Sequence, residues 1–368
     1  MTRLIVIGPV PPPFHGVSVS TSLVLANPHL RARFAVEHLD TSDRRTVQNV
    51  GRWDVRNVVE ALSALARLVP RLRGERGVVY LPISQGIPGL VRDTLFIRAA
   101  AATGWSVAAH LRGSELGGVY RRQPRPLRAW LRASFRQLAS LAVLGESLRD
   151  LLEGILPSSR IAVVPNGTPD PGSRDHTPGD PVGLYLGNLY PRKGALEALE
   201  AAQIVMRQRP QARFVFAGEC PDPSVRERFE GVMAETDGRI ELRPPVSGRE
   251  KDELLFDSGF LLFPPARQEG HPRVVLEAMA AGLPVITTDR GTIAETVIDG
   301  QCGYVLPAPV PSELAAFVIE LYDDAGFRDE MGRAARARYL ERFTEDVADR
   351  ALADWLEGVA RGRPADPR

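Results

Sequence analysis

The feature that most constrains the fold is a regular alternation, along the whole chain, between short apolar runs and longer segments of helical period. The first half contains RLIVIG, FAVEHLD, GVVYLPI, WSVAAHL, LAVLG and IAVVPN, and the second contains VGLYLG, RFVFAG, RIELRP, FLLFPP and PVITTD. Short apolar runs that alternate with helical segments are typical of buried strands in parallel βαβ units. The pattern therefore predicts an α/β fold of two doubly wound, Rossmann-like domains, with ligands beyond the carboxyl ends of the strands and a cleft between the domains.

The two domains differ in charge, and a stretch without period separates them. Residues 165–181, PNGTPDPGSRDHTPGDP, are rich in Pro, Gly and small polar residues. Residues 1–180 carry 23 arginines and 14 acidic residues, a net charge of +9, whereas the remainder carries 23 basic and 31 acidic residues, a net charge of −8. We predict a first domain over residues 1–172, a second over 173–345, and a C-terminal helix over 346–368 that packs back toward the first domain.

Bulk properties exclude several classes of protein. The 368 residues are 44% hydrophobic and 25% charged, which suits two globular cores. Cys220 and Cys302 form no C-x-x-C pair, so a disulfide framework or a zinc site is not expected. No apolar stretch approaches the length of a transmembrane helix, and the apolar run at the start is too short for a signal peptide. These properties predict a cytoplasmic protein, and we expect no nucleic-acid partner.

The stretch EGHPRVVLEAMAAG, residues 269–282, combines a buried helix with carboxylates. A helix from Pro272 to a stop at Gly282 is predicted, and Glu277 interrupts its apolar face. A carboxylate in apolar surroundings costs several kcal/mol unless it is paired or hydrogen-bonded. Glu277 is therefore a candidate to accept hydrogen bonds from the hydroxyls of a ribose, and Glu269 from those of a sugar. The alternative is a buried salt bridge between Glu277 and an arginine.

Two places in the second domain are suited to the diphosphate that joins a ribose to a sugar. At the mouth of the predicted helix, backbone N–H groups of Gly270, His271, Arg273 and Val274 favour an anion. In YLGNLYPRKG, a strand ends at Gly187, a loop carries Arg192 and Lys193, and Gly194 opens a helix, which brings cations and N–H groups together. Lys193 is one of only two lysines in the chain. The alternative for this loop is a pair of solvated basic residues.

The loop after the first strand argues against a nicotinamide or flavin enzyme. It reads GPVPPPFHGVS instead of G-x-G-x-x-G, and its prolines lack the N–H groups that a pyrophosphate needs. Gly16 still offers a turn able to approach a phosphate. A Pro-rich turn without a ligand is the alternative.

The segment FPPARQEGHPRVVLEAMAAGLPVITTDRGTIAETVIDGQCGYVLP resembles the C-terminal signature of retaining GT-B glycosyltransferases of family 4, also called glycosyl transferases group 1. The E-x7-E motif of that family falls on Glu269 and Glu277. GPVPPPFHGVSVS, VVPNGTPD, LGNLYPRKG and FVFAGE extend the likeness over nearly the whole chain. The resemblance implies that Glu277 binds the ribose of the donor, that Glu269 contacts the donor sugar, and that Lys193 contacts the diphosphate.

The sequence departs from the family pattern at three places. Asn188 stands where the family often has a diphosphate-binding arginine, which makes Arg192 the candidate substitute. Pro272 stands where a small residue is common, and it cannot donate to a phosphate. Family members often carry a histidine near the reacting sugar. AAHLRGSEL offers His110, and Arg112 is the alternative. A structural histidine is the other interpretation of His110.

The resemblance also implies an activity. We expect a retaining transfer from a nucleoside diphosphate sugar to a saccharide or lipid-linked acceptor held by the basic first domain, with no cofactor and no required metal, in cell-surface polysaccharide or glycolipid synthesis. Charge on the leaving diphosphate would be stabilised by Lys193 and the helix mouth. A GT-B-shaped epimerase or phosphorylase and a non-catalytic sugar-nucleotide sensor are the alternatives.

An arginine-rich segment suggests a membrane partner. Between Glu115 and Glu146 the chain has no acidic residue and six arginines, Arg121, Arg122, Arg125, Arg128, Arg132 and Arg136. The last four are at helical spacing, and Leu127, Leu131, Ser134, Leu138 and Ala142 are on roughly the opposite face. A stripe of one sign suits an anionic surface, so we predict peripheral binding to the cytoplasmic membrane face. A solvated helix face is the alternative.

Overall fold

A computed structural model describes residues 1–12, 16–43, 55–172 and 181–363. The chain forms two compact units, one from Met1–Pro165 together with Ala348–Arg368 and the other from Asn166–Val347. The chain thus passes from the first unit to the second after residue 165 and returns to the first after residue 347, whereas the predicted domain boundaries lay after residues 172 and 345. The first unit is therefore built from both ends of the chain.

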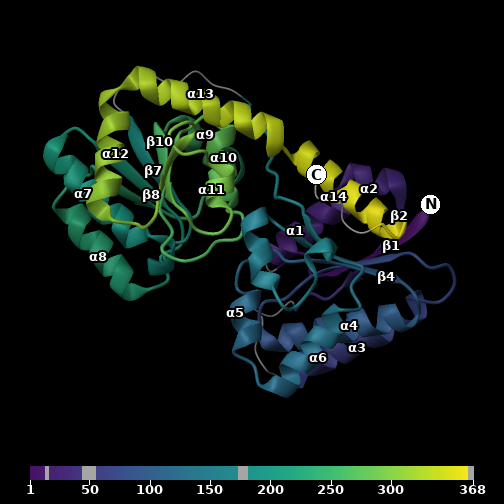
Figure 1. The fold of residues 1–368 in the computed structure, drawn as a ribbon. Coiled ribbons are helices and arrows are strands. Elements are labelled where there is room, and N and C mark those ends of the chain that lie inside the picture. The colour runs from purple at the N-terminus through teal and green to yellow at the C-terminus, as the bar shows by residue number, and fades with distance from the viewer. Residues whose placement is uncertain (13–15, 44–54, 173–180, 364–368) are drawn as a thin grey trace. The chain divides into compact units, whose positions relative to one another are not determined.

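The first unit contains a parallel sheet whose described strands follow the order β2-β1-β3-β4-β5-β6 (Figure 1). The strands are β1 (Thr2–Gly8), β2 (Phe34–Asp40), β3 (Val78–Pro82), β4 (Ser106–His110), β5 (Ser140–Val143) and β6 (Ile161–Val163). Each corresponds to one of the apolar runs of the first half. The central run β1 is apolar along its length because helices cover both faces: Ile5 and Ile7 belong to the core on one face, and Leu4 and Val6 to the core on the other.

Helices from distant parts of the sequence share the two faces of this sheet. One face packs against α3 (Val55–Arg71), α4 (Ile87–Ala102) and α6 (Arg125–Phe135). The other packs against α1 (Gly16–Ala26), α2 (Pro28–Arg33) and α14 (Glu345–Ala360). The remaining helical segments of the unit are α5 (Leu116–Arg121), η2 (Glu146–Leu152) and η3 (Ser158–Arg160).

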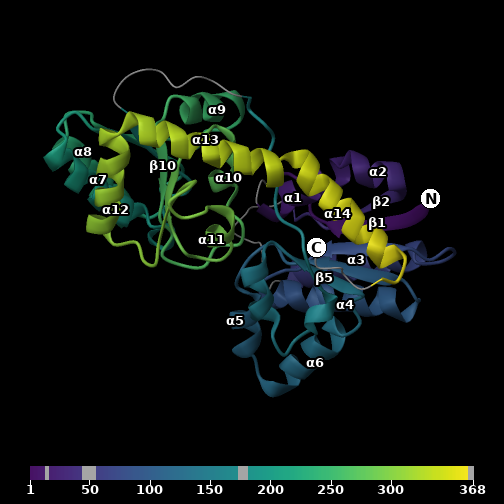
Figure 2. The ribbon, with the colours of Figure 1, turned by 45° about the horizontal axis from the view of Figure 1, so that its top comes forward.

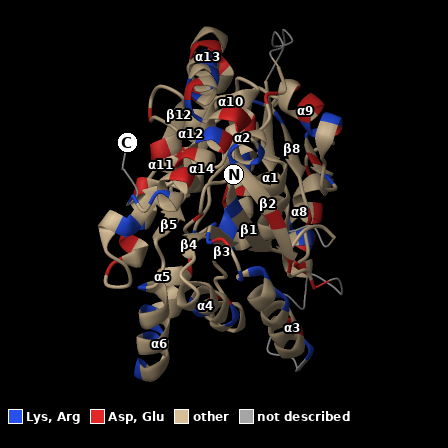
Figure 3. Cartoon of the chain, turned by 90° about the vertical axis from the view of Figure 1, so that its right-hand side faces the viewer, with Lys and Arg blue, Asp and Glu red and all other residues tan. Residues whose placement is uncertain are grey.

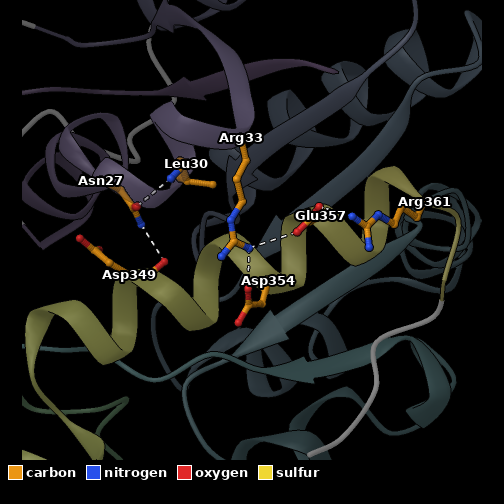
Figure 4. A network of polar contacts seen from close by, with 7 residues as sticks. All are labelled: Asn27, Leu30, Arg33, Asp349, Asp354, Glu357 and Arg361. Carbon is orange, nitrogen blue, oxygen red and sulfur yellow. Dashed lines mark hydrogen bonds and ion pairs between the residues drawn. The ribbon is translucent and has the colours of Figure 1, made fainter. Parts of the chain in front are cut away.

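The C-terminal helix α14 is fastened to the first unit by polar and apolar contacts. Arg33 Nη1 donates to Asp354 Oδ1 at 2.5 Å and to Glu357 Oε2 at 3.2 Å, as Figure 4 shows. Trp355 is only 8% exposed, and its Nε1 donates to Ser140 Oγ at 2.9 Å. In Figures 1 and 2, α14 lies beside α2. The helix predicted over 346–368 thus supplies part of the core of the first unit.

The second unit has a parallel sheet of its own, with the described strands in the order β12-β11-β10-β7-β8-β9. These are β7 (Val182–Leu186), β8 (Arg213–Ala217), β9 (Ile240–Arg243), β10 (Phe260–Phe263), β11 (Val285–Thr288) and β12 (Gly303–Leu306). The first five match the predicted runs, whereas β12 was not predicted. The structure confirms the α/β class with two Rossmann-like domains.

The helices of the second unit enclose this sheet around one continuous core. They are η4 (Pro191–Lys193), α7 (Ala195–Gln208), α8 (Pro223–Ala234), α9 (Gly248–Phe256), α10 (Arg273–Ala280), α11 (Ile293–Thr296), α12 (Pro311–Asp323) and α13 (Ala325–Arg342). α13 packs against both α10 and α12. α10, which carries the second glutamate of the E-x7-E motif, is therefore supported by the core rather than by a loop.

Candidate functional site

The strand order of the second unit reverses between β7 and β10. β7 pairs with β8 on one side and with β10 on the other. The loops that follow two such strands leave the same edge of the sheet in opposite directions, and ligands of doubly wound folds bind at this point. The loop after β7 carries Lys193, and the loop after β10 carries Glu269.

The loop after β7 is fixed from both sides. Gly194 has φ +73°, and a Cβ there would lie 1.8 Å from the carbonyl oxygen of Pro264, so no other residue fits without moving the backbone. The buried hydroxyl of Tyr185 donates to the carbonyl oxygens of Asn188 and Lys193, at 3.3 Å each. These contacts hold the lysine at the end of the loop in a defined place.

Lys193 is paired with the first glutamate of the motif. Its Nζ lies 3.3 Å from Glu269 Oε1, and the two side chains are 24% and 20% exposed. The same Nζ lies 5.4 Å from the ring centroid of Phe263. Burial, with a smaller contribution from the charge of Glu269, raises the pKa of Tyr185 far above its usual value. The structure therefore brings together two predicted site residues that are far apart in sequence.

Arg192 joins two loops through its backbone carbonyl oxygen, and its side chain lies against Tyr190. Its carbonyl oxygen accepts the N–H groups of Ala266, at 3.1 Å, and Arg267, at 3.2 Å, which joins the two loops. Its guanidinium is exposed and lies 5.2 Å from the ring centroid of Tyr190. Lys193, and not Arg192, is the cation at Glu269. That Arg192 replaces an arginine at Asn188 stays a prediction.

α10 presents its N-terminal end next to Glu269. Its N-cap is Pro272, whose side chain makes no cap hydrogen bond. At its other end, Gly282 has φ +77° and its N–H donates to Met279 O at 3.0 Å, which confirms the predicted stop. The helix starts one residue later than predicted, at Arg273. That the N–H groups of Gly270, Arg273 and Val274 meet a phosphate stays a prediction.

The side chain of His271 does not lie at the helix mouth. It is only 5% exposed; its Nδ1 accepts the N–H of Asn166 at 3.0 Å, and Asn166 Nδ2 donates to its carbonyl oxygen at 2.9 Å. Its ring stands edge-on to Phe343. Burial, and next the charge of Arg273, lower the pKa of His271 to about 3. The imidazole is thus buried and neutral, and the contact of the His271 backbone N–H with a donor stays a prediction.

The second glutamate of the motif is paired with the other lysine of the chain. Lys251 Nζ, on α9, donates to Glu277 Oε1 at 2.7 Å, and the side chains are 23% and 17% exposed. The alternative considered for Glu277 was a salt bridge with an arginine; the partner is a lysine. Lys251 was not predicted as a site residue. The signal was present in the sequence, because the chain has only two lysines.

His110 lies in the core of the first unit, and its predicted catalytic role stays a prediction. His110 ends β4 with no exposed surface; its Nδ1 lies 3.3 Å from Tyr80 Oη, and its ring is 5.9 Å from that of Trp355. Burial, and next the charge of Arg112, hold its pKa well below the usual value. Arg112 Nη2 donates to the same hydroxyl of Tyr80 at 3.3 Å. His110 is a core residue, because α14 covers the face of the sheet on which it lies.

Gly16 begins α1 and is exposed. A Cβ built on Gly16 meets nothing within 4 Å, so packing does not require a glycine there. The preceding residues 13–15 lie outside the described part of the chain. The approach of this loop to a phosphate stays a prediction.

The arginine-rich segment spans two helices, α5 and α6, and Figure 3 colours its arginines blue. All of its arginines are exposed except Arg128, which is half-buried. The helix is shorter than predicted: Arg136 is the C-cap of α6, and Ala142 lies in β5. Leu131 and Ser134 are buried as predicted. Among the described residues, no helix combines the length and the apolar character that crossing a membrane requires.

Comparison with known proteins identifies the class. Residues 170–338, within the second unit, match the family model of glycosyl transferases group 1. This part of the chain is therefore similar to that family, and the matched segment includes Lys193, Lys251, Glu269 and Glu277.

Curated relatives and a solved structure agree with this match. The D-inositol 3-phosphate glycosyltransferase of Streptomyces avermitilis is 32% identical over 183 residues, which are 47% of this chain and 39% of that protein. The glycogen synthase of Mycobacterium tuberculosis is 28% identical over 266 residues, 69% of this chain and 62% of that protein. The chain thus spans less than two thirds of the length of either relative. Anabaena Alr3699/HepE, solved in complex with UDP and glucose, has a TM-score of 0.72 at 15% identity, covering 97% of this chain and 100% of that one, and so shares the fold.

Proposed function

We propose that the chain is a retaining glycosyltransferase that moves a sugar from a nucleoside diphosphate sugar to a saccharide or lipid-linked acceptor. The observation that carries the proposal is the arrangement of the E-x7-E motif: each of its glutamates is paired with a lysine, Lys193 with Glu269 and Lys251 with Glu277. Glu269 stands at the switch point of the sheet. The match of residues 170–338 to the family model of glycosyl transferases group 1 supports glycosyl transfer as the reaction class.

The residues of the site fit the parts of such a donor. Glu277 would accept the ribose hydroxyls and Glu269 those of the sugar. Breaking the bond between the sugar and the phosphate leaves negative charge on the diphosphate, which Lys193 and the first-turn N–H groups of α10 would stabilise. Because protein groups supply this positive charge, the proposal includes no metal ion and no cofactor.

Comparison suggests where to begin with substrates. Anabaena Alr3699/HepE was solved with UDP and glucose, so a UDP-sugar is the first donor to test. The names of the two curated relatives refer to an inositol phosphate and to glycogen, which supports a hydroxyl of a sugar or polyol as the acceptor. We propose that the basic first unit binds the acceptor and that the product is a cell-surface polysaccharide or a glycolipid.

The surface of the first unit supports attachment to the cytoplasmic face of a membrane. The exposed arginines of α5 and α6 offer positive charge, and each arginine near anionic lipid contributes about 1 kcal/mol. α3, which packs on the same face of the sheet as α6, exposes Val58 (44%), Val59 (57%) and Leu62 (54%). Basic and apolar side chains together suit a peripheral membrane protein of the cytoplasm.

The proposal is tested in two steps. UDP-, GDP- and ADP-sugars are first compared by thermal shift, since a ligand that binds the native state raises its melting temperature. The stabilising donor is then incubated with the protein and candidate acceptors, with and without EDTA, and free nucleoside diphosphate and the anomeric configuration of the product are measured. Release of nucleotide with retained configuration supports the proposal. Binding without release would indicate a sensor, and a changed sugar still attached to its nucleotide would indicate an epimerase.

A further inference from the structure

We infer that Lys251 is a positioning residue for ribose recognition, holding one oxygen of Glu277 so that the other accepts a ribose hydroxyl, and that a lysine rather than an arginine is required there. The inference rests on the proposed function, because it assumes a nucleotide at Glu277.

The pair is close and specific to one oxygen. Lys251 Nζ lies 2.7 Å from Glu277 Oε1, on neighbouring helices α9 and α10. Both side chains are less than a quarter exposed, at 23% and 17%, so the carboxylate keeps limited contact with water. Among the described residues, this is the cation that meets Glu277. The lysine therefore compensates the charge of a carboxylate that stands among mostly apolar residues of α10 and restricts its orientation.

The choice of lysine is unusual in this chain. Two of its 46 basic residues are lysines, and these two are the partners of the motif glutamates. The guanidinium of arginine is a planar fork that tends to bind both oxygens of a carboxylate. The ammonium of lysine is a compact charge that satisfies one oxygen. Where a carboxylate must be neutralised and still accept a hydroxyl from a ligand, lysine leaves an acceptor that arginine would occupy.

Two other roles of Lys251, a contact that only stabilises the fold and a contact with the diphosphate, predict different results. If the contact only stabilised the fold, arginine would serve as well as lysine, because the charge is conserved. If Lys251 acted on the diphosphate of the ligand, its loss would weaken every nucleotide equally, with or without ribose hydroxyls. Positioning of Glu277 predicts a loss confined to nucleotides that carry those hydroxyls.

The experiment compares the full-length wild type with Lys251→Arg, Lys251→Met and the control Arg249→Met. Arg249 lies on the same helix, is paired with Glu253 and is 91% exposed, so its loss changes the same charge away from Glu277. Calorimetry measures the affinity for UDP and for 2′,3′-dideoxy-UDP, or for the GDP or ADP pair if that base stabilises the wild type. Thermal unfolding of each ligand-free variant verifies that it is folded.

We expect the wild type and Arg249→Met to prefer the ribonucleotide by at least about tenfold, as the loss of a charge-assisted hydrogen bond predicts. Both Lys251 variants should lose most of this preference while binding the dideoxy nucleotide as the wild type does. A preference that survives in Lys251→Arg would overturn the inference, and so would an equal loss for both nucleotides. If the wild type binds no nucleoside diphosphate, the proposed function fails and the inference with it, a result distinct from normal binding with an unchanged preference.

Discussion

Lys193 Nζ lies 3.3 Å from Oε1 of Glu269, although the two residues follow different strands of the sheet. The cation proposed for the leaving diphosphate thus has a carboxylate partner before any donor is bound. A donor would replace that contact with two others, phosphate on Lys193 and sugar hydroxyls on Glu269. Both side chains remain about a fifth to a quarter exposed, so both are accessible to a donor.

Replacing Lys193 by alanine should reduce turnover far more than stability. Its positive charge would act on charge that develops as the sugar leaves, so we expect a rate about 10² to 10³ lower than that of the wild type. Arg249→Ala is the control, because it removes one positive charge from an exposed side chain of the same unit that is paired with Glu253. Steady-state kinetics with a donor that the wild type uses measures both. Near-normal turnover of Lys193→Ala would make this lysine an ordinary surface residue.

Glu277→Ala should weaken the binding of a nucleoside diphosphate more than Glu269→Ala does. The ribose belongs to both the donor and the released nucleotide, whereas the sugar belongs only to the donor. Losing a charged hydrogen-bonding group costs about 1.5 to 3 kcal/mol. Calorimetry with the nucleoside diphosphate alone measures the difference, and thermal unfolding shows whether the unpaired Lys251 destabilises the variant. Unchanged affinity in Glu277→Ala would exclude the ribose assignment.

Acid should destabilise the second unit through His271. The pKa of this histidine is about 3 in the folded protein, against 6.5 for an unperturbed imidazole. Below pH 6.5 the unfolded chain therefore binds a proton that the folded chain excludes. From pH 7.5 to 5.5 the free energy of unfolding should fall by roughly 1 kcal/mol from this group alone.

The variant His271→Asn isolates that contribution. Asparagine keeps an acceptor at the δ position for the N–H of Asn166 but does not titrate. Calorimetric unfolding at pH 7.5 and 5.5 should show a smaller acid loss for the variant than for the wild type, whatever its stability at pH 7.5. Equal losses would mean that the imidazole is protonated in the folded state.

The arginine-rich segment should bind anionic vesicles. Changing Arg128, Arg132 and Arg136 to glutamine should reduce co-sedimentation with anionic liposomes, and binding by the wild type should weaken with salt. A control changes three exposed arginines of the second unit, Arg207, Arg249 and Arg333, and so removes the same charge. Equal recovery of the wild type on neutral and anionic vesicles would leave the segment as a solvated surface.

The fold was predictable because parallel strands covered on both faces read as continuous apolar runs. Eleven runs were identified, and each became a strand. The run that was overlooked, GYVL at β12, begins with a glycine and has one half-buried member, Val305. Glycine is depleted in strands, so this run resembled a strand less than the others did.

The site was predictable as far as neighbours in sequence determine it. Glu269 and Glu277 share one motif, but Lys251 reaches Glu277 only because two helices lie together in the folded unit. His110 is a second example. Its place at a strand end was visible in the sequence, but the packing of Trp355, from the far end of the chain, against its ring was not. Contacts between distant segments decide both cases, and no local pattern encodes them.

α14 gives the first unit an unusual history during synthesis. Its residues Leu352, Trp355, Leu356 and Val359 belong to the core on one face of the sheet, together with Leu4, Val6 and Tyr80. The ribosome produces these early strands first, yet the helix that covers them emerges only after the whole second unit. The second unit can therefore finish folding first, while the sheet of the first unit still exposes the apolar face that α14 will cover. Translation that stops early would release a protein with a complete second unit and an unfinished first one, a natural substrate for chaperones.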